Sequence, residues 1–169
     1  MKAILLLFIL LIACEKIEVD PNTFIDDRDG QRYATVQVGD NTWMAENLNY
    51  RPGGYNYMIT DKYGILYPFR EAVRYCPKGW RLPTPEEWEE VKDYFPDDIA
   101  LRTGEFKAKL SGWVQGEYMN KGRIGVWWTD TECFDKYAWV YYFAVNGFLA
   151  RTNFYKTNMA GVRCIKISD

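Results

Sequence analysis

The chain has 169 residues, of which 26% are charged, with a formal net charge of −2 and no histidine. The near-neutral balance and the lack of a basic run exclude the electrostatic footprint of a typical nucleic-acid-binding domain. Without histidine the chain lacks the commonest general base, the commonest metal ligand and every serine–histidine or cysteine–histidine nucleophile pair. We therefore expect no enzyme activity, no metal or other cofactor and no nucleic-acid partner.

The first 13 residues are typical of a secretory signal. Lys2 precedes an uncharged apolar run over residues 3–12, which is too short to span a bilayer because about 20 apolar residues are needed. The run ends in Leu-Ile-Ala-Cys at residues 11–14, which resembles the lipobox of bacterial lipoproteins. We expect residues 1–13 to be removed and Cys14 to be acylated as a membrane anchor. A plain signal peptide or a buried hydrophobic segment is the alternative.

Residues 14–23 contain a proline and are mostly polar, as expected of a short tether between a lipid and a folded domain. Residues 24–169 are long enough to form one domain with its own core. The domain begins with a predicted β-hairpin, because residues 33–38 and 42–44 have strand-like patterns around a Gly-Asp-Asn turn. The acidic residues within 26–30 are interpreted as a turn, since their spacing does not match a calcium-binding loop.

Two helices are predicted in the centre of the chain, on either side of a proline-rich connection. Residues 67–76 carry apolar side chains at helical spacing, and Pro77 cannot continue that helix. The second helix begins with Thr84 as N-cap, Pro85 in the first position and Glu87 completing a capping box. Its acidic pairs are interpreted as a first turn and a solvent-facing side. The side chains of the connection and second helix that are expected to point inward are Trp80, Leu82 and Trp88.

The remaining segments predict loops and strands. Residues 50–64 are interpreted as a surface loop rich in glycine and tyrosine, and residues 103–123 as a long irregular excursion. The runs expected to form strands are residues 125–129, 138–144, 148–152 and 160–167. An early hairpin, central helices and late strands together predict an α+β domain.

Three cysteines remain once Cys14 is assigned to the lipid, and an exported protein meets oxidising conditions. Cys76 and Cys164 are 88 positions apart, and a bridge over a loop of that length is worth about 4–5 kcal/mol by the chain-entropy estimate. Cys133 would then be left over. Cys133 is then either a partly buried free thiol or a thiol with a function, and both alternatives stay open.

The motifs "WMAENLNY" and "CPKGWRLPTPEEW" lie in segments that resemble the Fibrobacter succinogenes major paralogous domain. This family is found in lipoproteins and other exported proteins of Bacteroidetes and Fibrobacteres. The resemblance covers nearly the whole predicted domain, with its segments in the order seen in the family. These segments are residues 24–50, 63–88, 125–132 and 160–167.

The resemblance implies a C-type lectin-like fold with an N-terminal β-hairpin, two central helices and C-terminal antiparallel strands. It also implies a Cys76–Cys164 disulfide, because this pair matches the one that joins the first helix to the last strand in many lectin-like domains. The family's usual hosts imply a place in the cell envelope, at the outer membrane or cell surface. The calcium- and sugar-binding triplets of many C-type lectins are missing from the sequence, so calcium-dependent sugar binding is not carried over. The cysteine pair of the related formylglycine-generating enzymes is not matched either.

In lectin-like folds the long loops before the last strands usually form the binding face, and here those loops are rich in aromatic residues. Tyrosine and tryptophan offer a large contact area at a low cost in rotamer entropy, although packing within the core is the alternative. We expect a noncatalytic surface lipoprotein that binds a glycan, a peptide or another envelope protein. A structural or assembly role in a surface complex is the second hypothesis, and a degradative enzyme is the third. The candidate ligand-binding residues are Trp113, Tyr118, Phe154 and Tyr155.

Replacing Cys14 with serine tests the lipid anchor. The Cys14→Ser protein should lose acyl labelling and leave the membrane fraction, because the thiol that carries the lipid is gone. Labelling with a fatty-acid analogue and cell fractionation measure both effects. Cys133→Ser is the matched control that keeps the anchor. Unchanged membrane retention of the Cys14→Ser protein would rule the anchor out.

Overall fold

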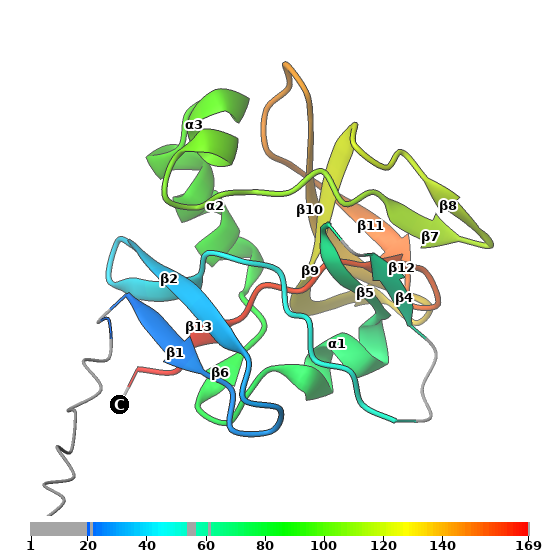
Figure 1. Cartoon of the computed structure of the whole chain (residues 1–169). Coiled ribbons are helices and arrows are strands. Elements are labelled where there is room, and N and C mark those ends of the chain that lie inside the picture. The colour runs from blue at the N-terminus through cyan, green and yellow to red at the C-terminus, as the bar shows by residue number, and fades with distance from the viewer. Residues whose placement is uncertain (1–19, 21, 54–56, 61, 169) are drawn as a thin grey trace, which may run out of the picture.

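The computed structural model describes residues 20, 22–53, 57–60 and 62–168. The predicted signal peptide, Cys14 and most of the predicted tether lie outside these residues. Strands in three sheets, together with three helices, make up the described part, so the α+β class predicted from the sequence is confirmed (Figure 1). Within the described ranges, no helix is long and apolar enough to cross a membrane.

The first sheet brings together strands from the beginning and the end of the domain. The predicted hairpin is confirmed, because Val38 pairs with Asn41 and leaves a two-residue turn of Gly39 and Asp40. Gly39 has a φ of 57°, a left-handed conformation that glycine adopts at little cost. The strands lie in the order β1 (Thr23–Ile25), β2 (Arg32–Val38), β3 (Asn41–Met44), β13 (Ile165–Lys166) and β6 (Trp80–Arg81).

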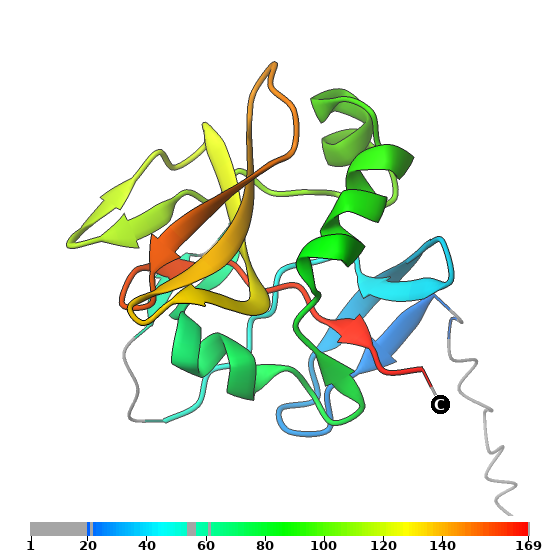
Figure 2. The same cartoon turned by 180° about the vertical axis from the view of Figure 1, so that it is seen from behind.

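The second sheet forms the middle of the molecule and is packed on both faces. Trp128 and Val140 belong to the hydrophobic cluster on one face. Trp127 and Tyr141 lie on the other face, where both rings stack on Trp88 of a helix. The loop over residues 145–149, which joins the last two strands of this sheet along the chain, projects from the body (Figure 2). The strands lie in the antiparallel order β11 (Ala150–Tyr155), β10 (Tyr137–Ala144) and β9 (Ile124–Phe134).

The third sheet is built largely from segments that the sequence predicts as irregular. The predictions of loops over residues 50–64 and 103–123 are therefore wrong in part. Strands of two or three residues are too short to show an alternating pattern, and Gly116, with a φ of 72°, turns the chain tightly between two of them. The strands lie in the order β4 (Met58–Thr60), β5 (Gly64–Pro68), β12 (Met159–Ala160), β7 (Trp113–Gln115) and β8 (Glu117–Met119).

Three helices lie in the described part of the chain, one more than the two expected. The predicted capping box is confirmed, because the Thr84 hydroxyl accepts from the Glu87 N–H and the Glu87 carboxylate accepts from the Thr84 N–H. The additional helix is capped by Asp97 and is too short to show a helical period. At the end of the helix that precedes it, Phe95 is buried in the core and Tyr94 is exposed. The helices are α1 (Phe69–Tyr75), α2 (Pro85–Tyr94) and α3 (Asp98–Thr103).

A disulfide joins Cys76, at the end of α1, to Cys164, just before β13, and confirms the predicted pair. The two Cα atoms are 5.8 Å apart. In the connection that follows Cys76, Leu82 is buried, and Trp88 is buried at the start of α2, as predicted. Trp80 is only half-buried. The bridge therefore ties the helical part of the chain to the first sheet.

Asn47, from the "WMAENLNY" motif, is the hydrogen-bonding centre of the core. Its Oδ1 accepts from Trp127 Nε1 at 2.8 Å and from Arg163 Nε at 3.1 Å. Its Nδ2 donates to the carbonyl of Tyr63 at 2.9 Å. One side chain thereby connects the turn before β5, the central sheet and the last part of the chain.

Arg163 is fully buried and forms no ion pair with any residue that the structure describes. Its guanidinium donates instead to the carbonyls of Met44, Phe106 and Lys107. The same group lies 4.4 Å from the centroid of the Phe106 ring. Burial disfavours the charged form and lowers the pKa of Arg163 to about 9. The buried charge therefore depends on these carbonyls and on Asn47.

Replacing Asn47 with alanine tests this centre. The Asn47→Ala protein should lose about 3 kcal/mol or more of its free energy of unfolding, because a buried indole N–H and a buried guanidinium N–H each lose their acceptor. Asn49→Ala is the matched control, since the Asn49 side chain makes one long hydrogen bond of 3.4 Å to Gln31. That control should lose less than about 1 kcal/mol. Urea unfolding measures both losses, and equal values would refute the role of Asn47.

Candidate functional site

Trp113 and Phe154, two of the predicted ligand-binding residues, pack against each other although they are far apart in the sequence. Their ring centroids are 5.7 Å apart, with the planes at 60°. Both side chains are half-buried. Trp113 lies on β7 and Phe154 on β11. The expectation that these aromatic residues lie in loops is therefore wrong, because both lie on strands.

Two hollows adjoin this aromatic pair, and we call them together the aromatic groove. The apolar hollow, of about 200 Å³, is lined by Trp113, Ile124, Val126, Tyr142, Thr152 and Phe154. The amide hollow, of about 270 Å³, is lined by Trp113, Gln115, Tyr137, Asn153, Phe154, Tyr155 and Asn158. Because Trp113 and Phe154 line both hollows, one ligand can contact both.

Tyr155, the third predicted residue, lies at the exposed end of the groove. It pairs with Tyr137 across β11 and β10, and their ring centroids are 4.3 Å apart. Tyr155 is 43% exposed, and Phe134, which contacts the Tyr137 ring, is 66% exposed. Cys133, next to Phe134, is half-buried and carries no disulfide. This end of the sheet offers aromatic rings to solvent, as interaction surfaces often do.

Tyr118, the fourth predicted residue, does not line either hollow. It pairs with Val114 in the β7–β8 hairpin, so it lies on the face opposite Trp113. Its ring packs against the small cluster that contains Val114 and Met159. Its hydroxyl donates to the carbonyl of Ser111 at 2.7 Å. The contacts of Tyr118 therefore support the hairpin that presents Trp113.

Gln115 and Asn158 belong to the groove, but the sequence did not single them out. Gln115 follows Trp113 by two positions, so in a strand both side chains lie on one face. That signal was hidden because the strand itself was not predicted. Asn158 is buried in the turn after β11, where its N–H donates to the carbonyl of Tyr155 at 2.8 Å. With Asn153, these residues supply the amide groups of the groove.

No charged side chain lines either hollow of the aromatic groove in the described structure. Charges lie at its margins instead. The guanidinium of Arg151 lies 4.6 Å from the centroid of the Trp139 ring. The amine of Lys156 pairs with Glu132 at 2.8 Å and donates to the carbonyl of Asp135 at 2.7 Å. The groove therefore suits a ligand, or a part of a ligand, that is uncharged.

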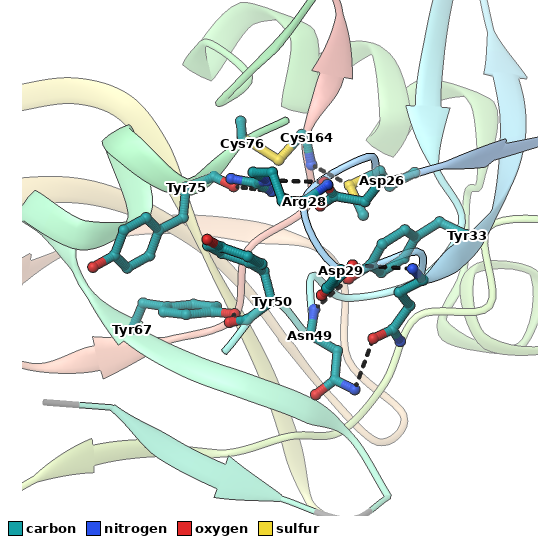
Figure 3. A network of polar contacts seen from close by, with 12 residues as sticks. Asp26, Arg28, Asp29, Tyr33, Asn49, Tyr50, Tyr67, Tyr75, Cys76 and Cys164 are labelled. Atoms are coloured by element: carbon teal, nitrogen blue, oxygen red, sulfur yellow. Dashed lines mark hydrogen bonds and ion pairs between the residues drawn. A yellow bond between two sulfur atoms is a disulfide. The ribbon is translucent and has the colours of Figure 1, made fainter. Parts of the chain in front are cut away.

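A separate polar network surrounds the disulfide (Figure 3). Arg28 Nε and Nη2 donate to the two carboxylate oxygens of Asp26 at 2.8 and 2.6 Å, and Nη2 also donates to the carbonyl of Tyr75 at 2.9 Å. The guanidinium lies 3.9 Å from the centroid of the Tyr50 ring. Burial alone would raise the pKa of Asp26, but the hydrogen bonds and charge of Arg28 outweigh it and hold this pKa below its ordinary value. The network holds the turn at residues 26–30 against α1.

A polar hollow of about 170 Å³ lies next to Asn47, but its groups are used within the protein. Asn47 serves the core, as described above. The Tyr33 hydroxyl accepts from the Asn49 N–H at 3.0 Å, and the Glu46 carboxylate accepts from the Ala34 N–H at 2.9 Å. Among the residues that the structure describes, no group of three or more cysteine or acidic side chains could hold a metal. The aromatic groove is therefore the stronger candidate site.

The aromatic groove is supported as a binding site by its own geometry. No protein-family model matches the chain, and no curated protein or solved structure matches it. The groove combines half-buried aromatic rings, amide side chains and an uncharged lining. Such a combination can bind a ligand by stacking and hydrogen bonding.

The Asp26–Arg28 pair predicts a specific response to acid. A carboxyl group whose pKa is lowered in the folded state stabilises the fold above its unfolded pKa, and this contribution is lost as the pH falls through the folded pKa. The Asp26→Asn protein should therefore be less stable at neutral pH, and its stability should fall less steeply below about pH 4. Thermal unfolding against pH measures both effects, with Asp27→Asn, an exposed carboxyl in the same turn, as control. An unchanged acid slope in the Asp26→Asn protein would contradict the assignment.

Proposed function

We propose that the chain is a cell-envelope lipoprotein of the Fibrobacter succinogenes major paralogous domain family with a C-type lectin-like fold. Its lipid on Cys14 holds it at the outer membrane or cell surface of a Bacteroidetes-type bacterium. The lipobox and the family motifs support this proposal. The bridge from the end of α1 to the region of the last strand is a further support, because the same pairing occurs in many lectin-like domains.

The protein acts as a noncatalytic binding module for a glycan, a peptide or another envelope protein. The observation that carries this proposal is the half-buried Trp113–Phe154 pair between two hollows. Rings held in place on strands lose little rotamer entropy when a ligand covers them. The amides of Gln115 and Asn158 beside the rings can fix the orientation of a polar ligand.

The contacts of the perturbed carboxylates support a noncatalytic role. Glu87, whose pKa is lowered chiefly by the Arg81 side chain against the effect of burial, is bound by Arg81 at 2.6 and 2.8 Å. Glu89, whose pKa is lowered chiefly by its hydrogen bond with Tyr141, lies on the solvent side of α2 and also pairs with Lys92. Neither carboxylate lines the aromatic groove.

A structural or assembly role in a surface complex is the second candidate. Two exposed phenylalanines favour it, because an exposed ring of this kind is typical of protein contacts. Phe134 is 66% exposed at the end of β9, and Phe148 is 74% exposed in the loop between β10 and β11. A degradative enzyme remains the third hypothesis.

Single alanine variants of the groove test the binding proposal. Trp113→Ala, Phe154→Ala and Tyr155→Ala should each weaken capture of a ligand by about 2 kcal/mol, or about 30-fold, as expected of aromatic anchors. The measurement uses the whole lipidated protein in detergent on a glycan array and on an array of short peptides, followed by affinity measurements on the hits. Phe148→Ala, an exposed ring outside the groove, is the control and should bind normally.

Two outcomes of this experiment would overturn the proposal. If the three groove variants bind as the unmodified protein does but unfold more easily, these rings serve packing alone. If the protein turns over a polysaccharide or peptide and loses that activity on removal of one carboxylate, the noncatalytic assignment is wrong. Tyr118→Ala should lower stability rather than binding, since its contacts lie within the hairpin.

A further inference from the structure

The strand β11 presents the longest uncovered sheet edge in the described structure. It is the outer strand of the central sheet, next to β10 (Figure 2). The other outer strand, β9, is covered, because the N–H of Trp128 donates to the carbonyl of Gly161 and the N–H of Gly161 donates to the carbonyl of Val126. The edge strands β1, β4, β6 and β8 of the other sheets have only two or three residues. β11 has six.

The register of β11 shows which of its backbone groups face outward. The N–H of Lys156 donates to the carbonyl of Lys136 at 2.9 Å, so this pair bonds across the two strands. Hydrogen-bonded pairs alternate along an antiparallel ladder. Arg151, Asn153 and Tyr155 therefore turn their backbone groups away from β10. The carbonyl of Tyr155 accepts from the turn that follows, and no hydrogen bond within the described structure reaches the outward groups of Arg151 and Asn153.

The amide hollow lies along this same edge. Three consecutive residues, Asn153, Phe154 and Tyr155, line it. Successive side chains of a strand point to opposite faces, so one hollow can touch all three only if it runs beside the backbone. Natural proteins usually protect such an edge with proline, lysine, a bulge or a short strand. β11 is six residues long, has no proline or lysine and pairs with β10 without a bulge, and its one charged residue is Arg151, near its start.

The apolar hollow lies where a side chain of an added strand would point. Thr152 and Phe154 of β11 line it together with Val126 and Tyr142 from the same sheet face, and Trp113 closes it from β7. Side chains opposite one another in paired strands share a face. A residue that pairs with Thr152 or Phe154 would thus place its side chain in this hollow.

The charges at the two ends of β11 complement an acidic partner. Arg151 is exposed, and no ion pair that the structure describes includes it. Its guanidinium lies against the Trp139 ring, and its charge also acts on the Glu89 carboxylate, whose pKa it helps to lower. Lys136, at the other end of the β10–β11 pair, is also exposed. Lys156 is already paired with Glu132. The edge therefore fits a segment that is apolar at its centre and acidic at an end.

We propose that β11 is the docking strand for an extended peptide segment of a partner protein, which adds to the central sheet, inserts an apolar side chain under Trp113 and places an acidic side chain near Arg151. Addition of a strand to an exposed edge is a recurring form of peptide recognition, in which main-chain hydrogen bonds give affinity and pockets for alternate side chains give specificity. The inference rests on the proposed function, since it uses the aromatic groove and names the partner class.

Synthetic peptides and the whole lipidated protein in detergent test this inference. The probes are nine-residue peptides with blocked ends, with leucine, alanine or aspartate at the centre and glutamate or lysine at the ends. We expect peptides with central leucine and terminal glutamate to bind at least tenfold more tightly than those with central aspartate or terminal lysine. The best peptide is then made in two N-methylated forms, one with methyl groups on the odd-numbered residues and one with methyl groups on the even-numbered residues. One form should lose binding and the other should keep it, because only every second N–H of the peptide faces β11.

Variants of Asn153 provide the matched test on the protein. Asn153→Pro removes an N–H that faces outward and leaves the ladder to β10 intact, a place where an edge strand tolerates proline. It should lower peptide affinity at least tenfold. Asn153→Ala keeps the N–H and loses only the side-chain amide that lines the hollow, so it should bind peptide at least threefold more tightly than Asn153→Pro does. Circular dichroism and thermal unfolding confirm that both proteins are folded, and the N-methylated peptides give an answer on the unmodified protein if Asn153→Pro does not fold.

The remaining outcomes separate the two proposals. The inference is wrong if no peptide of the set binds, if both N-methylated sets bind equally, or if Asn153→Pro binds as Asn153→Ala does. If a glycan binds and Trp113→Ala abolishes that binding while peptides fail, the groove is a ligand site but the partner is not a peptide. If peptides bind and neither Trp113→Ala nor Asn153→Pro alters the affinity, both the groove and the docking strand are wrong.

Discussion

A positive charge that is buried without a carboxylate partner among the described residues is the constraint on which the rest of the fold depends. The guanidinium of Arg163 is surrounded by the carbonyls of Met44, Phe106 and Lys107 and by the side chain of Asn47. These acceptors come from separate parts of the chain, and each must be in place before the charge is satisfied. An unsatisfied buried charge is strongly destabilising. The core is therefore expected to form cooperatively rather than sheet by sheet.

This core also holds the aromatic groove in place. Trp127 binds Asn47, and its neighbour Trp128 faces the other side of the same strand. The Trp128 indole N–H donates to the carbonyl of Tyr67 at 2.7 Å, and its ring lies 6.2 Å from the ring of Phe154. Phe154, which lines the groove, thus packs against a ring that a buried hydrogen bond holds in place. A site that is already ordered loses little entropy when a ligand binds.

Local sequence rules account for the hairpin turn at Gly39 and for the capping box at Thr84, because both depend on residues close together in the chain. The helix α3 and the short strands of the third sheet were not predicted, since segments of two to six residues show no measurable period. The contact between Trp113 and Phe154 depends on the pairing of β7 with β12, which follows β11 directly. No local pattern encodes a pairing between segments so far apart, so the aromatic residues could be named but their arrangement could not be derived.

The disulfide also determines how the domain responds to mechanical tension. β1 and β13, close to the two ends of the described chain, lie in the first sheet, so a pull on both ends acts first on these short strands. The bridge joins Cys76 and Cys164, which are 88 positions apart in the sequence. At about 3.5 Å per residue, it withholds roughly 300 Å of chain from extension. The central sheet lies entirely within the enclosed segment. A stretching force can therefore separate the strands of the first sheet. The strands that carry Trp113 and Phe154 are not extended until the bridge is reduced.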